Sequence, residues 1–114
     1  MAHIIDRKEW ADGPEAWKGE LECGAHGADV SLIFNLLTGP GGGPRLHKHP
    51  YPEIFIIRAG EGLFTVGESQ IRAVAGQIII VPADTPHKFT NSGTAPLETI
   101  DIHASGRFIT EWLE

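Results

Sequence analysis

Short apolar runs alternate along the chain with clusters of glycine, proline, asparagine and serine, and this pattern predicts strands joined by turns. The main apolar runs lie within residues 30–37, 53–58, 63–66 and 78–81, and residues 97–103 are predicted to be the last long strand. Turn-forming clusters recur about every eight to twelve residues, which is typical of a β-sandwich or barrel. No internal repeat or low-complexity tract interrupts the pattern. We therefore predict an all-β fold.

Several turns and strand boundaries can be assigned within this pattern. Gly60–Gly62 is predicted to be a tight hairpin turn, so that residues 63–66 return antiparallel to residues 53–58. Gly67–Ser69 is predicted to form a second hairpin, and the apolar run 78–81 is expected to be a buried strand. Shorter strands are expected at residues 3–6, 19–23, 70–74 and 87–91.

Length and charge limit the classes of function. The chain has 114 residues, which suits one domain over residues 1–114. Its net charge of −6, from 9 basic and 15 acidic residues, argues against nucleic acid as a partner. The start of the chain, MAHIIDRKEW, lacks the apolar core of a signal peptide, and no apolar run is long enough to span a bilayer. We expect a cytoplasmic protein with no membrane partner.

The segment Gly41–Gly60, GGGPRLHKHPYPEIFIIRAG, contains a group of residues typical of a metal site. His47 and His49 are two residues apart, and Glu53 follows four residues later. Alternate side chains of a strand point to the same face, so the three converge if the chain stays extended. Two imidazoles and a carboxylate can each direct a lone pair at a shared point. Another histidine, His87, lies in a later segment bounded by turns.

Both glycine-punctuated segments resemble the two sequence motifs of the cupin superfamily. Motif one, residues 41–60, is matched by Gly41, His47, His49, Glu53 and Gly60. Motif two, residues 76–91, is matched by Gly76, Pro82, His87 and Asn91. The one departure is Asp84, where the family usually has glycine, and aspartate tolerates the left-handed backbone region. The resemblance, to a small single-domain cupin, implies a double-stranded β-helix or jelly-roll barrel, in agreement with the all-β prediction.

The same resemblance implies that His47, His49, Glu53 and His87 bind one divalent transition metal inside the barrel. Three neutral imidazoles and a carboxylate suit Fe, Mn, Ni, Co, Cu or Zn, and the sequence does not choose among them. Because the set contains no thiolate, a cysteine-rich structural zinc site is excluded. On an octahedral ion these four ligands would leave two positions for water, substrate or O₂.

Four residues are candidates for contact with a small-molecule substrate. Arg45 has the parity of His47 and can hold a substrate carboxylate through its guanidinium. A solvated surface arginine is the simpler interpretation of that position. Tyr51, Phe55 and Phe89 are candidates for the pocket wall, with core packing as the alternative.

Two polar residues are candidates for support of the metal site. Asn91 is a motif position, and its side chain is better suited to tying a turn than to touching substrate. His103 lies on the last long strand with Asp101 on the same face, so it can hydrogen-bond the metal ligands or carry a proton. A solvent-exposed or dimer-surface position for His103 is the alternative.

Three functions remain open at this stage, and two of them are enzymatic. The first is a metal-dependent dioxygenase acting on a small oxygen-bearing organic substrate, because the ligand set resembles that of cupin dioxygenases. The second is a non-redox isomerase, decarboxylase or hydrolase in which the ion is a Lewis acid. The third is a protein that binds a small ligand or a metal without catalysis. The fold does not decide among them.

A homodimer is expected from the distribution of apolar residues. Residues 53–58 are apolar on both faces, which suits a strand that also packs against a second subunit. Near the C-terminus, Phe108, Ile109, Trp112 and Leu113 have near-helical spacing. We expect this tail to pack on the body of the protein or on a partner subunit.

Overall fold

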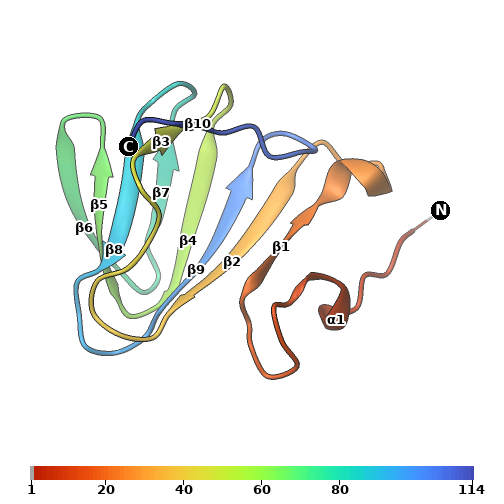
Figure 1. The fold of residues 1–114 in the computed structure, drawn as a ribbon, viewed down its shortest axis with the longest axis horizontal. Helices are drawn as coiled ribbons and strands as arrows, with labels where there is room; N and C mark the ends of the chain where they lie inside the picture. Colours follow the sequence, from red (N-terminus) through yellow and green to blue (C-terminus); the bar gives the residue numbers. More distant parts are fainter. Residues whose placement is uncertain (1) are drawn as a thin grey trace.

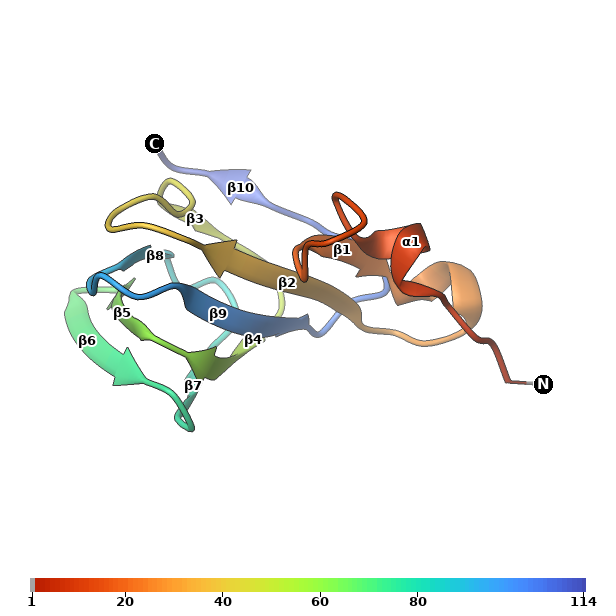
Figure 2. The same ribbon diagram turned by 90° about the horizontal axis from the view of Figure 1, so that it is seen from below.

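The computed structural model describes residues 2–114, whose main strands form two antiparallel five-stranded sheets facing one another (Figures 1 and 2). The first sheet has the order β1 (Gly19–Glu22), β2 (Ser31–Leu37), β9 (Leu97–His103), β4 (Glu53–Ala59) and β7 (Ile78–Val81). The second has the order β10 (Glu111–Trp112), β3 (His47–Lys48), β8 (His87–Asn91), β5 (Glu61–Val66) and β6 (Ser69–Val74). The prediction of an all-β sandwich is confirmed.

An aromatic cluster holds the two sheets together. Phe55 of β4 meets Phe64 of β5 edge to face, with ring centroids 5.2 Å apart, and Phe64 stacks on Phe89 of β8 at 5.1 Å. Ile57 and Leu97 complete this buried cluster from the first sheet. Each fully buried side chain of this size contributes roughly 1.5–3 kcal/mol to folding, so the cluster is a major source of stability.

The interior changes from apolar to polar along β9. Every second side chain of this strand is buried, in the order Leu97, Thr99, Asp101 and His103. Since β4 runs antiparallel to β9, Glu53 lies opposite His103 at the polar end. One half of the sandwich therefore holds the apolar core, and the other half holds buried polar groups.

The predicted hairpin at Gly60–Gly62 is wrong, because the chain changes sheet there. β4 pairs with β7 and β9, whereas β5 pairs with β6 and β8 in the opposite sheet. Gly60 has φ +81°, and a Cβ on it would lie 2.3 Å from the carbonyl oxygen of Pro96. Glycine is needed here for both reasons. The second predicted hairpin is confirmed, since Val66 pairs with Ser69.

The N-terminal segment also differs from expectation. Residues 3–6 form no strand, and a short helix α1 (Arg7–Trp10) follows them. Trp10 stacks on Phe34 of β2 with ring centroids 4.1 Å apart, and Trp17 meets the same ring from its edge. A 3₁₀ helix, η1 (Cys23–His26), joins β1 to β2. No helix within residues 2–114 is long and apolar enough to cross a membrane.

β7 is an edge strand, so the prediction that it is buried is wrong for one of its faces. Ile78 and Ile80 are 60% and 66% exposed, while Val81 is buried. β-Branched side chains favour an extended backbone whether or not a second sheet covers them.

The C-terminal tail is extended rather than helical. It crosses the ends of β9 and β4 and forms β10, in which Trp112 pairs with His47 of β3 (Figure 1). The Leu113 N–H donates to the Leu46 carbonyl, and the carboxylate of Glu114 lies 3.3 Å from Lys88 Nζ. The tail thus packs on the body of its own chain, over the polar end of the sandwich.

Candidate metal centre

The four predicted metal ligands come from both sheets. His47 of β3 is the direct pairing partner of His87 at the start of β8. His49 follows β3, and the chain then crosses to the first sheet, where Glu53 begins β4. The expectation that His47, His49 and Glu53 share one strand is therefore wrong, although the crossing still turns all three inward.

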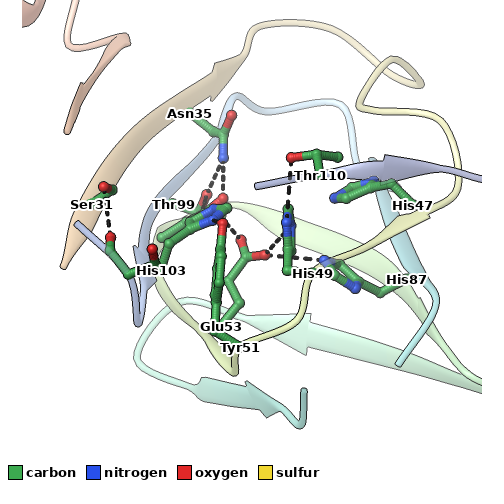
Figure 3. Close-up of polar contacts among 12 residues, drawn as sticks. Ser31, Asn35, His47, His49, Tyr51, Glu53, His87, Thr99, His103 and Thr110 are labelled. Carbon is green, nitrogen blue, oxygen red and sulfur yellow. Dashed lines mark hydrogen bonds and ion pairs between the residues drawn. The ribbon is translucent and has the colours of Figure 1, made fainter. Parts of the chain in front are cut away.

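The ligating atoms of His47, His49, Glu53 and His87 converge on one point of the interior (Figure 3). These atoms all lie within 4.8 Å of one another, and all four residues are buried. Glu53 Oε1 lies 3.0 Å from His87 Nε2 and 3.1 Å from His49 Nε2. A buried carboxylate at this distance from several imidazoles is a suitable site for a divalent cation.

The three imidazoles share a hydrogen-bonding arrangement that suits metal binding. Each places Nδ1 next to a backbone carbonyl: Arg45 for His47 at 2.7 Å, Ile109 for His49 at 2.8 Å, and Thr85 for His87 at 2.8 Å. A carbonyl only accepts, so each Nδ1 carries the hydrogen, and in the neutral ring Nε2 has a free lone pair. His49 Nε2 is buried without a well-aligned hydrogen bond. The donor set therefore fits a divalent metal.

His103 supports Glu53 from the side opposite the other imidazoles. Its Nε2 lies 3.2 Å from Glu53 Oε2, and its Nδ1 is 2.7 Å from the hydroxyl of Tyr51. The Ile109 N–H donates to that hydroxyl at 3.3 Å, so Tyr51 can donate its own proton to His103. Burial raises the pKa of Tyr51 and keeps it a phenol. This chain of contacts orients the second oxygen of Glu53.

Glu53 is held as a carboxylate by its neighbours. Burial by itself would raise its pKa, but the close contacts with the imidazoles of His103, His49 and His87 outweigh burial and lower the pKa of Glu53 well below its usual range. His47 shows the opposite balance: burial lowers its pKa more than the contact with the Arg45 carbonyl raises it. A lowered pKa favours the neutral imidazole that metals require.

Asp84 shapes the turn that precedes His87. It has φ +61°, and its N–H donates to the His49 carbonyl at 2.7 Å. The expectation that aspartate replaces glycine in a left-handed turn is confirmed. This bond ties motif two to motif one beside the four converging residues.

The substrate candidates separate into two groups. Phe55 and Phe89 line a cavity of about 480 Å³ that has His47, His49 and Glu53 on its wall. Tyr51 is buried behind His103 and is not part of that lining. Arg45 is exposed and lies outside the cavity, with its guanidinium carbon 5.1 Å from the ring centroid of Trp112. The structure thus does not place Arg45 where it could hold a substrate beside the four converging residues.

Asn91 ties a turn, as its motif position suggested. Its side-chain amide donates to the carbonyls of Leu37 and Ala95, both at 3.0 Å, and its Oδ1 accepts from the Gly93 N–H at 2.9 Å. These bonds connect β2 to the β8–β9 connection. Asn91 does not line the cavity.

Several cavity residues were not identified as site residues from the sequence. They are Asn35 and Asp101 on the first sheet, and Phe108, Thr110 and Trp112 on the C-terminal tail. A polar residue in the middle of the apolar run 30–37 was a usable signal for Asn35. The tail residues carried no such signal, because only the pairing of β10 with β3 brings them to the cavity.

Comparison with known families places the fold. A family model for the cupin domain matches residues 36–103, more than half of the chain, including all four converging residues. The chain belongs to the cupin family. Its two facing sheets are those of a double-stranded β-helix, as the resemblance of the two motifs implied.

Relatives and solved structures support this assignment. An uncharacterized protein from Methanocaldococcus jannaschii is 39% identical over 56 residues, or 48% of this chain and 45% of that protein. A double-stranded β-helix protein from Klebsiella pneumoniae has a TM-score of 0.75 at 21% identity, covering 100% of this chain and 99% of that one. Oxalate decarboxylase from Bacillus subtilis, solved as a variant, has a TM-score of 0.74 at 19% identity, covering 83% of this chain and 27% of that one. At such identities the structural likeness shows the fold. This cupin spans less than half the length of the curated relatives that it matches.

Metal binding by this cupin is expected to weaken in mild acid. Burial lowers the pKa of His87, but its hydrogen bonds to Glu53 and to the Thr85 carbonyl outweigh burial and raise the pKa above the usual 6.5. A proton on His87 Nε2 competes with a metal for the same lone pair. Affinity for Co(II), followed by absorption, should therefore be constant at alkaline pH and should begin to fall at a pH above 6.5. An affinity that is unchanged from about pH 8 to pH 5.5 would contradict this role of His87.

Proposed function

We propose that this cupin binds one divalent transition metal through His47, His49, Glu53 and His87, and uses it as a dioxygenase acting on a small oxygen-bearing organic molecule. The observation that carries the proposal is the convergence of three imidazoles and one carboxylate within 4.8 Å, beside a cavity of about 480 Å³. Fe, Mn, Ni, Co, Cu and Zn are all compatible with such ligands. The Bacillus subtilis oxalate decarboxylase, which has a similar fold, contains Mn(II) centres, and this supports a divalent ion.

A metal at this site would supply Lewis acidity and, if redox-active, a means of reacting with O₂. The chain itself contributes positioning. Three backbone carbonyls fix the rings of His47, His49 and His87, and His103 fixes the second oxygen of Glu53. Phe55 and Phe89 provide an apolar part of the cavity wall. Such rigid support keeps the ligands in place while a substrate enters.

A non-redox reaction is the second candidate. It is supported by the fold shared with oxalate decarboxylase, since a decarboxylase, isomerase or hydrolase can use similar ligands for a Lewis acid. Oxygen uptake separates the two candidates, because only the dioxygenase consumes O₂. A protein that binds metal but turns over no substrate in either assay would be a non-catalytic binding protein.

Metal content tests the shared premise. Protein made in metal-replete medium should contain about one divalent metal per chain, and His47→Ala with His49→Ala should reduce this to below roughly a tenth. Metal at about a hundred times its Kd should also stabilise the natural protein by about 2.7 kcal/mol, and the double variant should lose this gain. Elemental analysis and thermal unfolding measure the two effects.

The matched control for this experiment is His3→Ala. His3 is exposed on the N-terminal segment and lies far from the four ligands in sequence, so its removal should leave the metal content unchanged. Equal metal content in the double variant and in the control would show that the metal binds elsewhere. A finding that the natural protein contains no metal would contradict the proposal itself.

We also propose that the protein is a homodimer formed by the outer face of the first sheet. Six isoleucines share this face on β9, β4 and β7, in two rows of paired residues: Ile80, Ile54 and Ile102, then Ile78, Ile56 and Ile100. We call these six residues the isoleucine face. On neighbouring β2, Phe34 pairs with Ile100 and so continues the second row. Trp10 of the same chain stacks on Phe34. A second copy would cover the part that the N-terminal segment does not reach.

Substitution of Ile80 tests the dimer. A twofold interface contains each residue twice, so Ile80→Lys should introduce two buried charges and weaken association at least about tenfold. Light scattering at micromolar concentration should give a dimer for the natural protein and a monomer for the variant. Ile4→Lys is the control, because Ile4 is 88% exposed on the N-terminal segment. A monomeric natural protein would overturn the proposal.

A further inference from the structure

The cavity beside the metal centre has two chemically distinct regions. One end holds His47, His49 and Glu53, and the first sheet contributes Asn35 and Asp101 at a separate part of the wall. Asp101 precedes His103 by two residues on β9, a separation of about 7 Å along a strand. His103 also lines the cavity, and much of the remaining lining is apolar, with contributions from Ile33, Leu37, Phe55, Phe89, Phe108 and Trp112.

No lysine or arginine side chain lines this cavity within residues 2–114. Arg45, the nearest arginine in motif one, is exposed outside it against Trp112. With the lining imidazoles neutral, a bound metal would therefore be the positive charge that a ligand meets. A carboxylate placed away from the metal would be desolvated beside Asp101 with no cation to neutralise it, which is costly.

Asn35 and Asp101 form a hydrogen-bonded pair with one acceptor left over. Asn35 Nδ2 lies 2.5 Å from Asp101 Oδ2 and 3.1 Å from Thr99 Oγ1, and Thr99 donates to Asp101 Oδ1 at 2.8 Å. The amide nitrogen of Asn35 is thus fully engaged. Its carboxamide oxygen points away from Thr99 in Figure 3, and among residues 2–114 no hydrogen bond uses it, so it can accept one. A ligand that donates an O–H or N–H would complement that oxygen.

The charge state of Asp101 reinforces this preference. Complete burial, and then the nearby charge of Glu53, raise the pKa of Asp101 well above its usual range. Burial therefore favours the neutral form of Asp101. Neither side chain of the pair carries a positive charge that could hold an anion.

We propose that Asn35 and Asp101 form a second binding subsite, and that the ligand of this cupin is an uncharged molecule with adjacent oxygens at one end and a hydroxyl or N–H donor at the other. Its middle is apolar, matching the apolar side chains of the cavity lining. The adjacent oxygens bind the metal, so this part rests on the proposed function. The distal donor binds Asn35 Oδ1.

Three catechols that differ only at the ring position away from the adjacent oxygens test the subsite. They are 3,4-dihydroxybenzyl alcohol with an uncharged donor, 4-methylcatechol with an apolar group, and 3,4-dihydroxybenzoate with an anion. Their affinities are measured without O₂ on protein loaded with Co(II), whose absorption reports binding. The benzyl alcohol should bind at least about tenfold tighter than the benzoate, with 4-methylcatechol between them. A benzoate that binds as tightly as the benzyl alcohol would overturn the proposal.

Two variants assign the preference to the subsite. Asn35→Leu should reduce the affinity for the benzyl alcohol to that for 4-methylcatechol, because the acceptor is gone. Glu20→Gln is the control, since Glu20 is an exposed carboxylate that also borders the cavity. If Glu20→Gln abolishes discrimination against the benzoate, the charge of Glu20 at the cavity edge causes the preference. The proposal of a subsite at Asn35 and Asp101 would then be wrong. If Asn35→Leu fails to fold, the order of the three probes on the natural protein still decides.

Co(II) uptake is measured before any probe is added, and this separates two kinds of failure. No uptake would contradict the proposed metal function and, with it, the chelating half of the ligand. Uptake followed by a reversed order of the probes would contradict the subsite alone. Uptake followed by binding of none of them would contradict chelation of the metal by the adjacent oxygens.

Discussion

The buried carboxylate of Glu53 is the constraint on which the polar half of this cupin depends. A carboxylate removed from water is costly unless cations or hydrogen-bond donors compensate it. Here His49 and His87 approach one oxygen and His103 approaches the other. A divalent metal would supply the same compensation while using the imidazole lone pairs, so the site is prepared for a cation by the rest of the fold.

The fold produces this arrangement by joining two sheets of different character. β3 and β8 bring His47 and His87 from one sheet, and β4 brings Glu53 from the other. The C-terminal tail then closes the polar end: the Ile109 carbonyl fixes His49, and Trp112 packs beside His47 with ring centroids 5.1 Å apart. The apolar cluster around Phe64 holds the sheets together from the other half, so packing and chemistry occupy separate ends of one interior.

The sequence predicted the motifs better than the path between them. Spacing and resemblance identified His47, His49, Glu53 and His87, because such residues recur at fixed positions in the family. The change of sheet at Gly60 could not be read from a glycine-rich turn, since the same residues also suit a hairpin. The role of the tail depends on pairing between segments far apart in sequence, which local periodicity does not report. For the same reason Asn35 was overlooked and Asp101 was noted only as sharing a face with His103: strand pairing, rather than spacing, brings Asn35 and Asp101 together.

X-ray absorption at the edge of the bound metal tests most directly whether these four residues form one site. With His47, His49, His87 and Glu53 as ligands, the first shell contains only nitrogen and oxygen, and the outer shell shows the scattering of three imidazoles. A sulfur scatterer at about 2.3 Å would contradict this assignment, because it would require a cysteine ligand. Scattering from four imidazoles would contradict it as well, since His103 would then be a ligand rather than the support of Glu53.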